Sequence, residues 1–199
     1  APPVRPAAPP VRPAAPPVAG SAPAAPSAVD LPPVGGLSWD ALQERVASCR
    51  LCPLCQGRNR TVFGAGDPHA SLMFIGEGPG YDEDQQGIPF VGKAGQLLTK
   101  MIEAMQFSRE EVFIAKCRPP GNRNPEPEEA EACLPYVHRQ IELVQPQVIV
   151  LLGAVPLRWL LGGQSIRRER GQWHEYRGIA VMPTFHPSYL LRLPAAKRE

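Results

Sequence analysis

The segment Gln147-Val-Ile-Val-Leu-Leu152 constrains the fold most, because its apolar residues follow one another without a polar face. A strand exposed on one side alternates polar and apolar residues, whereas a continuous β-branched and aliphatic run suits a strand covered on both faces. The apolar stretch from Val148 to Val155 is about half as long as a bilayer-spanning helix requires. The segment therefore predicts a buried strand of a parallel sheet, ended by Gly153, and no transmembrane helix.

Strand and helix patterns alternate along the rest of the chain. This alternation predicts an α/β fold with a mainly parallel sheet of about four strands. Ligands of such sheets sit beyond the carboxyl ends of the strands, which directs attention to Gly76–Gly80, to the residues after Ala115 and to Thr184–Arg192. The expected strands are Ser71–Gly76, Val112–Ala115, Gln147–Leu152 and Ile179–Pro183, and the expected helices are Trp39–Ser48, Gly95–Met105, Pro127–Val144 and Val155–Leu161.

The first 36 residues have a different composition from the rest, with 12 Pro and 10 Ala. The heptad Ala-Pro-Pro-Val-Arg-Pro-Ala occurs twice from Ala1 and begins a third time. Proline fixes φ and removes backbone donors, so this stretch favours a disordered, extended polyproline II tail. We expect a tail over residues 1–36 and one domain over residues 37–199. The tail is either a spacer or a ligand for a Pro-binding protein partner, with Arg5 and Arg12 as its polar contacts.

Charge and the N-terminal composition restrict the environment. The net charge of +2 excludes a strongly acidic or basic protein, although residues 158–199 carry eight Lys or Arg against three Glu. That local excess is typical of a surface that faces nucleic acid and also of a plain solvated face. The N-terminus has no continuous apolar stretch of the kind found in secretory signals. We expect a cytoplasmic monomer without membrane contact.

Five cysteines form two groups. Cys49, Cys52 and Cys55 are spaced two residues apart, and Cys117 and Cys133 follow later. The odd number and the missing secretion signal argue against a disulfide framework. Two cysteines separated by two residues can bind one metal centre from a single turn, and thiolates gathered from distant segments suit zinc or an iron–sulfur cluster. The spacing leaves those two alternatives open.

Two segments at predicted strand ends carry the features of a binding site. Gly76-Glu-Gly-Pro-Gly80 is followed by further acids and by no base before Lys93, so it would repel a phosphate and suits a neutral nucleobase. His186 opens a stretch, predicted to be a surface loop, that continues to Arg192. A histidine there can donate a hydrogen bond or titrate near neutrality. Leu190 and Leu191 followed by Arg192 suit an apolar wedge and a phosphate contact in a DNA minor groove.

These motifs together resemble the family-4 uracil-DNA glycosylases, the iron–sulfur members of the uracil glycosylase superfamily. The resemblance extends from about Trp39 to Arg192. It implies a three-layer α/β/α fold, a [4Fe-4S] cluster, and hydrolysis of the N-glycosidic bond of deoxyuridine in DNA, which releases uracil during DNA repair. The motifs that carry it are Gly76-Glu-Gly-Pro-Gly80, Glu83-Asp84, Gly87-Ile-Pro-Phe-Val-Gly92, Lys116-Cys-Arg-Pro-Pro120 and His186-Pro-Ser-Tyr-Leu-Leu-Arg192.

The resemblance also implies roles for individual residues. The cluster ligands would be Cys49, Cys52, Cys117 and Cys133, which leaves Cys55 without a role and the cluster with a structural one. Glu77, Gly78 and Pro79 would line the uracil pocket and Phe90 would stack on the base. Glu83 would exclude the 5-methyl group of thymine, and His186 would donate a hydrogen bond to uracil O2 as negative charge develops. The DNA contacts would come from Pro187, Ser188, Leu191 and Arg192.

The chain departs from the family pattern after Ala115. The family usually has an Asn and two apolar residues before the Lys-Cys-Arg-Pro-Pro stretch, and about three residues, roughly 10 Å of extended chain, are missing here. The missing Asn is the residue expected to pair with the uracil edge. Two other hypotheses therefore accompany uracil release: a catalytically impaired, DNA-binding iron–sulfur protein of the same fold, and an interaction module that acts through the Pro-rich tail.

Overall fold

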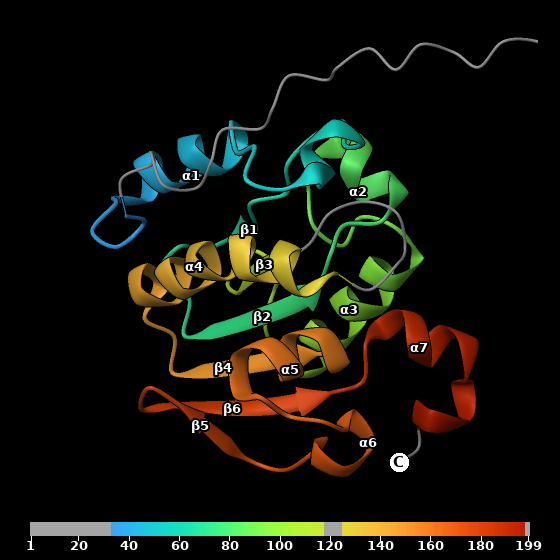
Figure 1. The fold of residues 1–199 in the computed structure, drawn as a ribbon. Helices are drawn as coiled ribbons and strands as arrows, with labels where there is room; N and C mark the ends of the chain where they lie inside the picture. The colour runs from blue at the N-terminus through green and yellow to red at the C-terminus, as the bar shows by residue number, and fades with distance from the viewer. Residues whose placement is uncertain (1–32, 118–124, 198–199) are drawn as a thin grey trace, which may run out of the picture.

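The computed structural model describes residues 33–117 and 125–197, with only the backbone of Cys117. Within these residues seven α-helices surround a sheet of six strands (Figure 1). Short 3₁₀ turns lie at Pro53–Gln56 and Pro194–Lys197. The helices are α1 (Trp39–Ala47), α2 (Tyr81–Gln86), α3 (Lys93–Ala104), α4 (Pro127–Val144), α5 (Ala154–Leu161), α6 (Ile166–Glu169) and α7 (Pro187–Arg192), and the strands are β1 (Ala65–Gly66), β2 (Leu72–Glu77), β3 (Phe113–Cys117), β4 (Val148–Leu152), β5 (His174–Tyr176) and β6 (Ile179–Thr184).

The strand order of the sheet is β1-β3-β2-β4-β6-β5. The four inner strands are parallel and in register, so that Ile75 of β2 pairs with Ala115 of β3 and with Leu151 of β4. These are the four strands that the sequence predicts. The expected count of four is wrong for the whole sheet, because β1 and β5 add antiparallel edges of two and three residues. Edges this short have no detectable alternation of polar and apolar residues.

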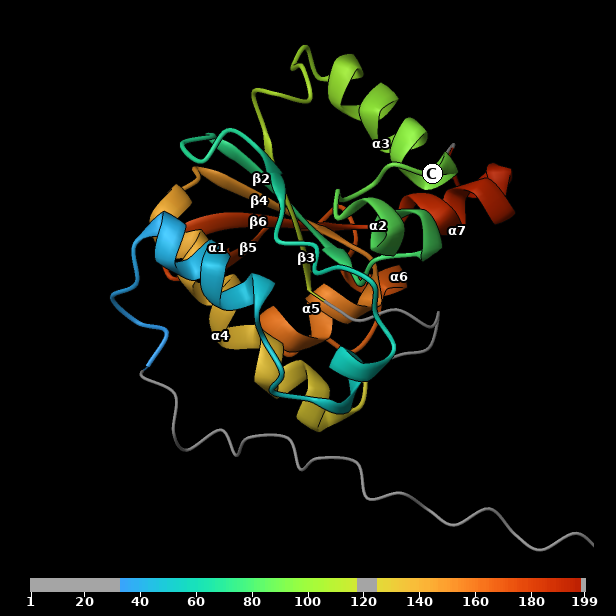
Figure 2. The ribbon, with the colours of Figure 1, turned by 90° about the horizontal axis from the view of Figure 1, so that it is seen from above.

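Helices cover both faces of the sheet, which confirms the three-layer α/β class (Figure 2). On one face Met73 and Ile75 of β2 pack with Val137 and Ile141 of α4, and Trp39 of α1 joins that core. The alternate residues of β2, Leu72 and Phe74, face the other way and pack with Leu98 and Ile102 of α3. On that second side α7 packs against α3, with Leu190 close to Leu97 and Met101.

Helix boundaries follow local chemistry. Helix α1 begins after Ser38, whose Oγ accepts a hydrogen bond from the Ala41 N–H at 3.3 Å, as predicted for an N-cap. Helix α4 has the predicted bounds, and the Glu129 carboxylate accepts a hydrogen bond from the Glu126 N–H at its start. Strand β3 continues two residues beyond the expected end at Ala115.

Two segments expected to be loops contain helices. Residues 81–86, inside the Gly-rich acidic segment, form α2, which ends at Gly87 in a left-handed conformation with φ of 74°. The expected surface loop after His186 is α7 instead, because Pro187 occupies the first helical position, where its missing N–H costs nothing. The side chains of this segment are therefore fixed by a helix rather than by an extended loop.

Residues 1–32, most of the expected Pro-rich tail, lie outside the described residues, so the predicted boundary between tail and domain stays a prediction. None of the helices that the structure describes is long and apolar enough to cross a bilayer.

Leu98 is fully buried between α3 and the sheet. We expect Leu98→Ala to lower the free energy of unfolding by about 2–5 kcal/mol, because it leaves a cavity in a packed core. Urea denaturation followed by circular dichroism measures this change. The matched control is Gln96→Ala on the exposed side of the same helix, which should stay within about 0.5 kcal/mol of the wild type. Equal effects of both substitutions would contradict the packing described here.

Candidate active site

A cavity of about 550 Å³ opens at the carboxyl edge of the sheet. Its walls come from the turn after β2, from the start of α3, from β3 and from the start of α7. The structure thus brings together the two segments that the sequence singles out, although they are about a hundred residues apart in the chain. The lining residues expected from the sequence are Glu77, Gly78, Pro79, Glu83, His186, Ser188 and Arg192.

Glu83 holds the wall of this cavity together. Its carboxylate accepts hydrogen bonds from the backbone N–H groups of Gly80 and Phe90. The Nζ atom of Lys116 lies 2.7 Å from Oε1 and 2.8 Å from Oε2 of the same carboxylate. The Glu83 side chain is buried, and these contacts compensate for the loss of its hydration. Because both oxygens are engaged, Glu83 positions the loop and is not a free general base.

The structure places Phe90 behind the cavity wall. Its backbone has a φ of 55°, and its ring packs so closely on Gly76 that a Cβ at that position would lie 2.7 Å from a ring carbon. The Phe90 and His186 ring centroids are 5.5 Å apart and nearly parallel. The Lys116 Nζ lies 3.9 Å from the Phe90 ring centroid. Phe90 is only 3% exposed, does not line the cavity and is covered by the Lys116 ammonium, so the stacking of a base on this ring stays a prediction.

Lys116 is the site residue that sequence reasoning missed. It pairs with Gly76 in the β2–β3 register, and it shares a face of β3 with Ile114, the face that packs on α3. The signal that could have found it is its position directly after the predicted strand Val112–Ala115, at the edge where ligands of parallel sheets bind. Burial lowers the pKa of Lys116, while the charge and hydrogen bond of Glu83 oppose that shift.

His186 is the N-cap of α7, and this fixes its ring. Its Nδ1 accepts a hydrogen bond from the Ser188 N–H at 3.1 Å and lies 2.7 Å from Ser188 Oγ. The hydrogen-bond network therefore assigns the proton to Nε2, which is buried without a partner among the described residues. Burial, reinforced by Lys116 and Arg192, lowers the pKa of His186 to about 4. At neutral pH the site thus contains an uncharged histidine with one unused N–H donor.

Helix α7 separates its apolar residues. Leu190 is buried against α3, whereas Leu191 is 41% exposed and Arg192 lies at the cavity mouth. Pro187 is buried at the first turn, where it shapes the helix, and its expected DNA contact stays a prediction. Ser188 lines the cavity and orients His186. The exposed Leu191 and Arg192 are the residues of this helix that can reach a molecule at the cavity mouth.

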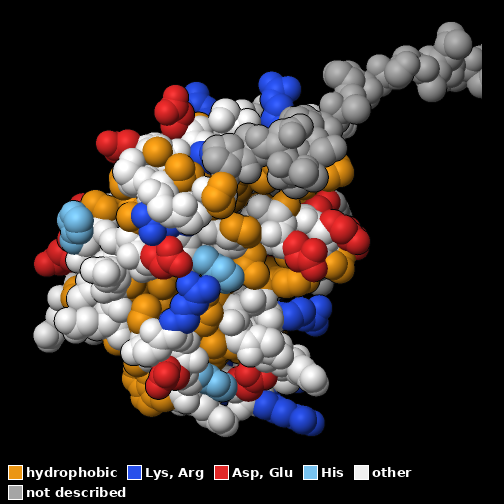
Figure 3. All heavy atoms as spheres, turned by 60° about the vertical axis from the view of Figure 1, so that its left-hand side comes forward, with side chains coloured by type: hydrophobic (Ala, Val, Ile, Leu, Met, Phe, Trp, Pro, Cys, Tyr) orange, Lys and Arg blue, Asp and Glu red, His pale blue; other side chains and the backbone are white. Residues whose placement is uncertain are grey.

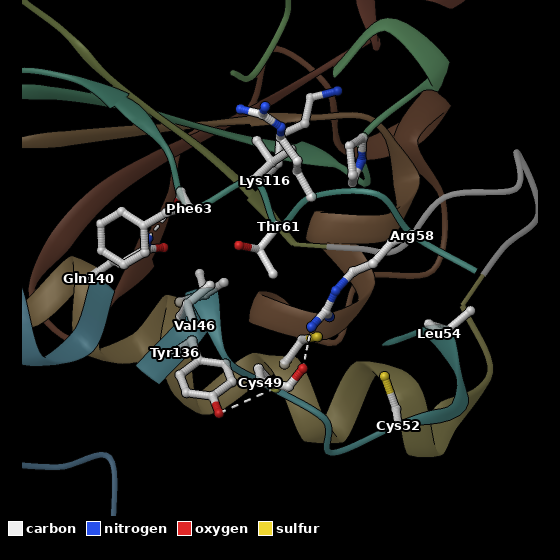
Figure 4. A pocket seen from close by; sticks show the side chains of 15 residues that line it. Val46, Cys49, Cys52, Leu54, Arg58, Thr61, Phe63, Lys116, Tyr136 and Gln140 are labelled. Atoms are coloured by element: carbon white, nitrogen blue, oxygen red, sulfur yellow. Dashed lines mark hydrogen bonds between the residues drawn. The ribbon is translucent and has the colours of Figure 1, made fainter. Parts of the chain in front are cut away.

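A second cavity, of about 80 Å³, is lined by three of the four predicted metal ligands (Figure 4). Cys49 and Cys52 line it from the connection between α1 and the 3₁₀ turn, and Cys133 lines it from α4. The backbone of Cys117 ends β3, and its side chain is outside the described residues. Among the side chains that the structure describes, no three His, Cys, Asp or Glu are placed to hold a metal ion. Three thiols converging on one cavity nevertheless fit a thiolate-bound centre in donor chemistry.

Polar contacts fix the cysteine segment. The Tyr136 hydroxyl donates to Cys49 Sγ at 3.5 Å, and Arg58 donates to the Cys49 carbonyl. Burial raises the pKa of the Cys52 thiol. Cys55 does not line this cavity and faces a different surface hollow, and its lack of a role as a ligand stays a prediction.

Surface charge elsewhere is mixed. The face in Figure 3 shows basic and acidic side chains interspersed, without a patch of one sign. At the mouth of the larger cavity the exposed cations Lys93 and Arg192 stand beside the acidic residues Asp82 and Glu77. A concentration of basic side chains therefore does not identify the candidate site. The cavity and the residues that line it identify it.

Comparisons with known proteins agree with the α/β fold and with the family that the sequence motifs resemble. A family model described as the uracil DNA glycosylase superfamily matches residues 63–199. The type-4 uracil-DNA glycosylase of Thermotoga maritima is 46% identical over 159 residues, which cover 77% of this chain and 83% of that protein. The type-4 enzymes of Sulfurisphaera tokodaii and Archaeoglobus fulgidus are 42% and 39% identical, each over 81% of this chain and over 79% and 87% of their own lengths.

The lowered pKa of His186 makes a prediction about stability. In the unfolded chain the pKa is about 6.5, so between pH 6.5 and about 4 the unfolded state binds a proton that the folded state does not. The contribution of this residue to the free energy of unfolding is therefore fully present above pH 6.5. It decreases by about 3 kcal/mol as the pH falls toward 4. His186→Gln should remove that part of the decline. Urea unfolding at pH 7 and pH 4 measures it, and identical declines in wild type and variant would contradict it.

Proposed function

The chain belongs to the uracil DNA glycosylase superfamily, and from this membership we propose that the larger cavity receives a uracil extruded from DNA. The enzyme hydrolyses the N-glycosidic bond between that base and deoxyribose. Water adds to the sugar carbon, the base nitrogen leaves with the bonding electrons, and the products are uracil and an abasic site. The observation that supports this most directly is His186, which lines a cavity large enough for a pyrimidine and whose buried Nε2 has no partner among the described residues.

DNA is the partner that this reaction requires. A base inside a duplex cannot reach a cavity in the protein, so it must leave the stack at a cost of a few kcal/mol. Leu191, exposed beside the cavity mouth, is suited to enter the gap that the base leaves. Arg192 follows it and can pair with a phosphate. The buried neighbour Leu190 anchors both residues to α3.

His186 acts on the leaving base. As the bond breaks, negative charge accumulates on the uracil carbonyl oxygens, and a fixed N–H donor stabilises that charge more than it stabilises the intact substrate. Ser188 holds the ring in the tautomer that presents Nε2–H. Because burial keeps His186 neutral, the residue donates a hydrogen bond without transferring a proton.

The cavity offers weak activation of the attacking water. Gly78 has no side chain to act as a base, and Glu83 is engaged by Lys116 and by two backbone N–H groups. Glu77 and Asp82 are the other carboxylates that line the cavity. We therefore assign most of the rate enhancement to stabilisation of the leaving group.

For the smaller cavity we propose a [4Fe-4S] cluster held by Cys49, Cys52, Cys117 and Cys133. Three of these thiols line the same cavity, and Cys117 follows directly on Lys116, which also contributes to that cavity. When bound, the cluster supplies a cross-link between three chain segments: the connection after α1, the end of β3, and α4. Zinc bound by the same thiolates is the alternative, and visible absorbance distinguishes the two.

Removing the His186 donor tests the proposed reaction. On a duplex with a single deoxyuridine, wild-type protein should produce alkali-labile sites, and His186→Ala should produce them about 10²–10³-fold more slowly, as for the loss of one oxyanion donor. The matched control is His69→Ala at an exposed position, with unchanged rates. Wild-type protein that binds the duplex without releasing uracil would instead support the impaired DNA-binding protein.

Loss of one ligand tests the cluster. Anaerobically prepared wild-type protein should show the broad visible absorbance of thiolate-bound iron, and Cys52→Ser should lose it together with part of the stability, because metal binding and folding are coupled. Cys55→Ser should retain both. A colourless wild-type protein that contains one zinc per chain would replace the cluster by zinc, and equal loss in both variants would contradict the assigned ligand set.

A further inference from the structure

The β2–β3 register places an unusual group in the base-binding cavity. Residues of β3 alternate between the two faces of the sheet, so Lys116 lies on the side of Ile114 and α3, level with Gly76. Lys116 lines the cavity and Phe90 does not, and the Lys116 Nζ lies 3.9 Å over the Phe90 ring. The surface that a bound base meets at this wall is therefore an ammonium group in front of an aromatic ring.

The contacts of the ammonium leave capacity for a ligand. A lysine Nζ carries three N–H donors and no acceptor. The Glu83 carboxylate takes one side of the group at 2.7 and 2.8 Å, and the Gly78 carbonyl accepts at 3.2 Å. Among the described residues the ammonium thus makes hydrogen bonds to Glu83 Oε2 and to the Gly78 carbonyl, with Oε1 of the same carboxylate as its ion-pair contact. Two hydrogen bonds use two of the three donors and leave one N–H for a bound molecule. The ion pair with Glu83 holds the group in place, so the remaining donor is oriented before a base arrives.

We propose that Lys116 is a specificity-determining residue, whose ammonium donates a hydrogen bond to the 4-carbonyl of the extruded base. This proposal rests on the proposed function of the cavity. His186 would donate to the 2-carbonyl of the base, and Lys116 would donate to the 4-carbonyl. A group that can only donate selects a carbonyl. Uracil has an acceptor at position 4, whereas cytosine has an amino group there, which would leave two donors facing each other. Polar sites built on such pairing discriminate strongly, because the wrong base leaves a buried group unpaired.

Base analogues in the wild-type protein test the contact directly. The duplexes carry uracil, 4-thiouracil or 2-pyrimidinone on a 2′-fluorinated sugar that resists hydrolysis, and affinity is measured by titration at fixed salt. Loss of a hydrogen bond to a charged donor weakens binding about 10- to 100-fold. We expect 2-pyrimidinone, which has no 4-carbonyl, to bind weaker than uracil by that factor and 4-thiouracil to lie between them. Equal affinities for uracil and 2-pyrimidinone would overturn the assignment.

A variant then ties the preference to the lysine. Lys116→Met keeps the length of the side chain without its donors, and the ratio of uracil to 2-pyrimidinone affinity should fall to near one. The matched control, Lys100→Met on the exposed side of α3, should keep the wild-type ratio. An unchanged ratio in folded Lys116→Met would contradict the proposal, and if that variant does not fold, the analogue series in the wild type decides.

Uracil release measured in parallel separates the two proposals. A wild-type protein that prefers uracil over 2-pyrimidinone without releasing it would overturn the glycosylase function and keep the Lys116 assignment. A protein that releases uracil and shows no such preference would do the reverse.

Discussion

The buried carboxylate of Glu83 is the contact on which the site depends. A carboxylate removed from water is costly unless its oxygens are paired, and here the partners come from separate elements: the N–H of Gly80 where α2 begins, the N–H of Phe90, and the ammonium of Lys116 on β3. The left-handed backbone of Phe90 and the position of Lys116 are thus fixed by one group. Change at any of these partners leaves a charge or a donor unpaired and reshapes the same wall.

The sheet topology supplies the rest of the site. Parallel strands present their carboxyl ends at one edge, so the turn after β2 and the segment after β6 converge although the sequence separates them. Close packing at the ends of the strands brings the side chains of these two segments near each other. Gly153, with a φ of 100°, ends β4 so near His186 that a Cβ there would lie 3.1 Å from the His186 Cβ. The glycine lets the histidine approach the sheet, and Ser188 then orients its ring.

The sequence could predict those segments whose secondary structure is determined by their own residues rather than by pairing with distant parts of the chain. Helix α4 and strand β4 are long or strongly apolar, and their bounds and types follow from periodicity and capping. Strand β5 has three residues and takes its conformation from pairing with β6, which no local pattern reveals. The sequence identified His186 and the acidic turn after β2 as candidate functional segments. It did not identify Lys116, because the role of this residue depends on the register of β3, where a shift of one residue would turn the side chain to the opposite face.

The two cavities share a wall, and this explains how a cysteine-bound centre can matter to a hydrolytic reaction without taking part in it. Pro79 and Lys116 line both cavities, and Asp84 of α2 accepts hydrogen bonds from the backbone of Asn59, beyond the first cysteine group. A centre that immobilises these cysteines restrains the end of β3, and with it the lysine behind which Phe90 lies. Because Lys116 and Cys117 are consecutive, the thiolate ligation and the base recognition that we propose depend on the same strand end. A purely structural centre therefore suffices to link them.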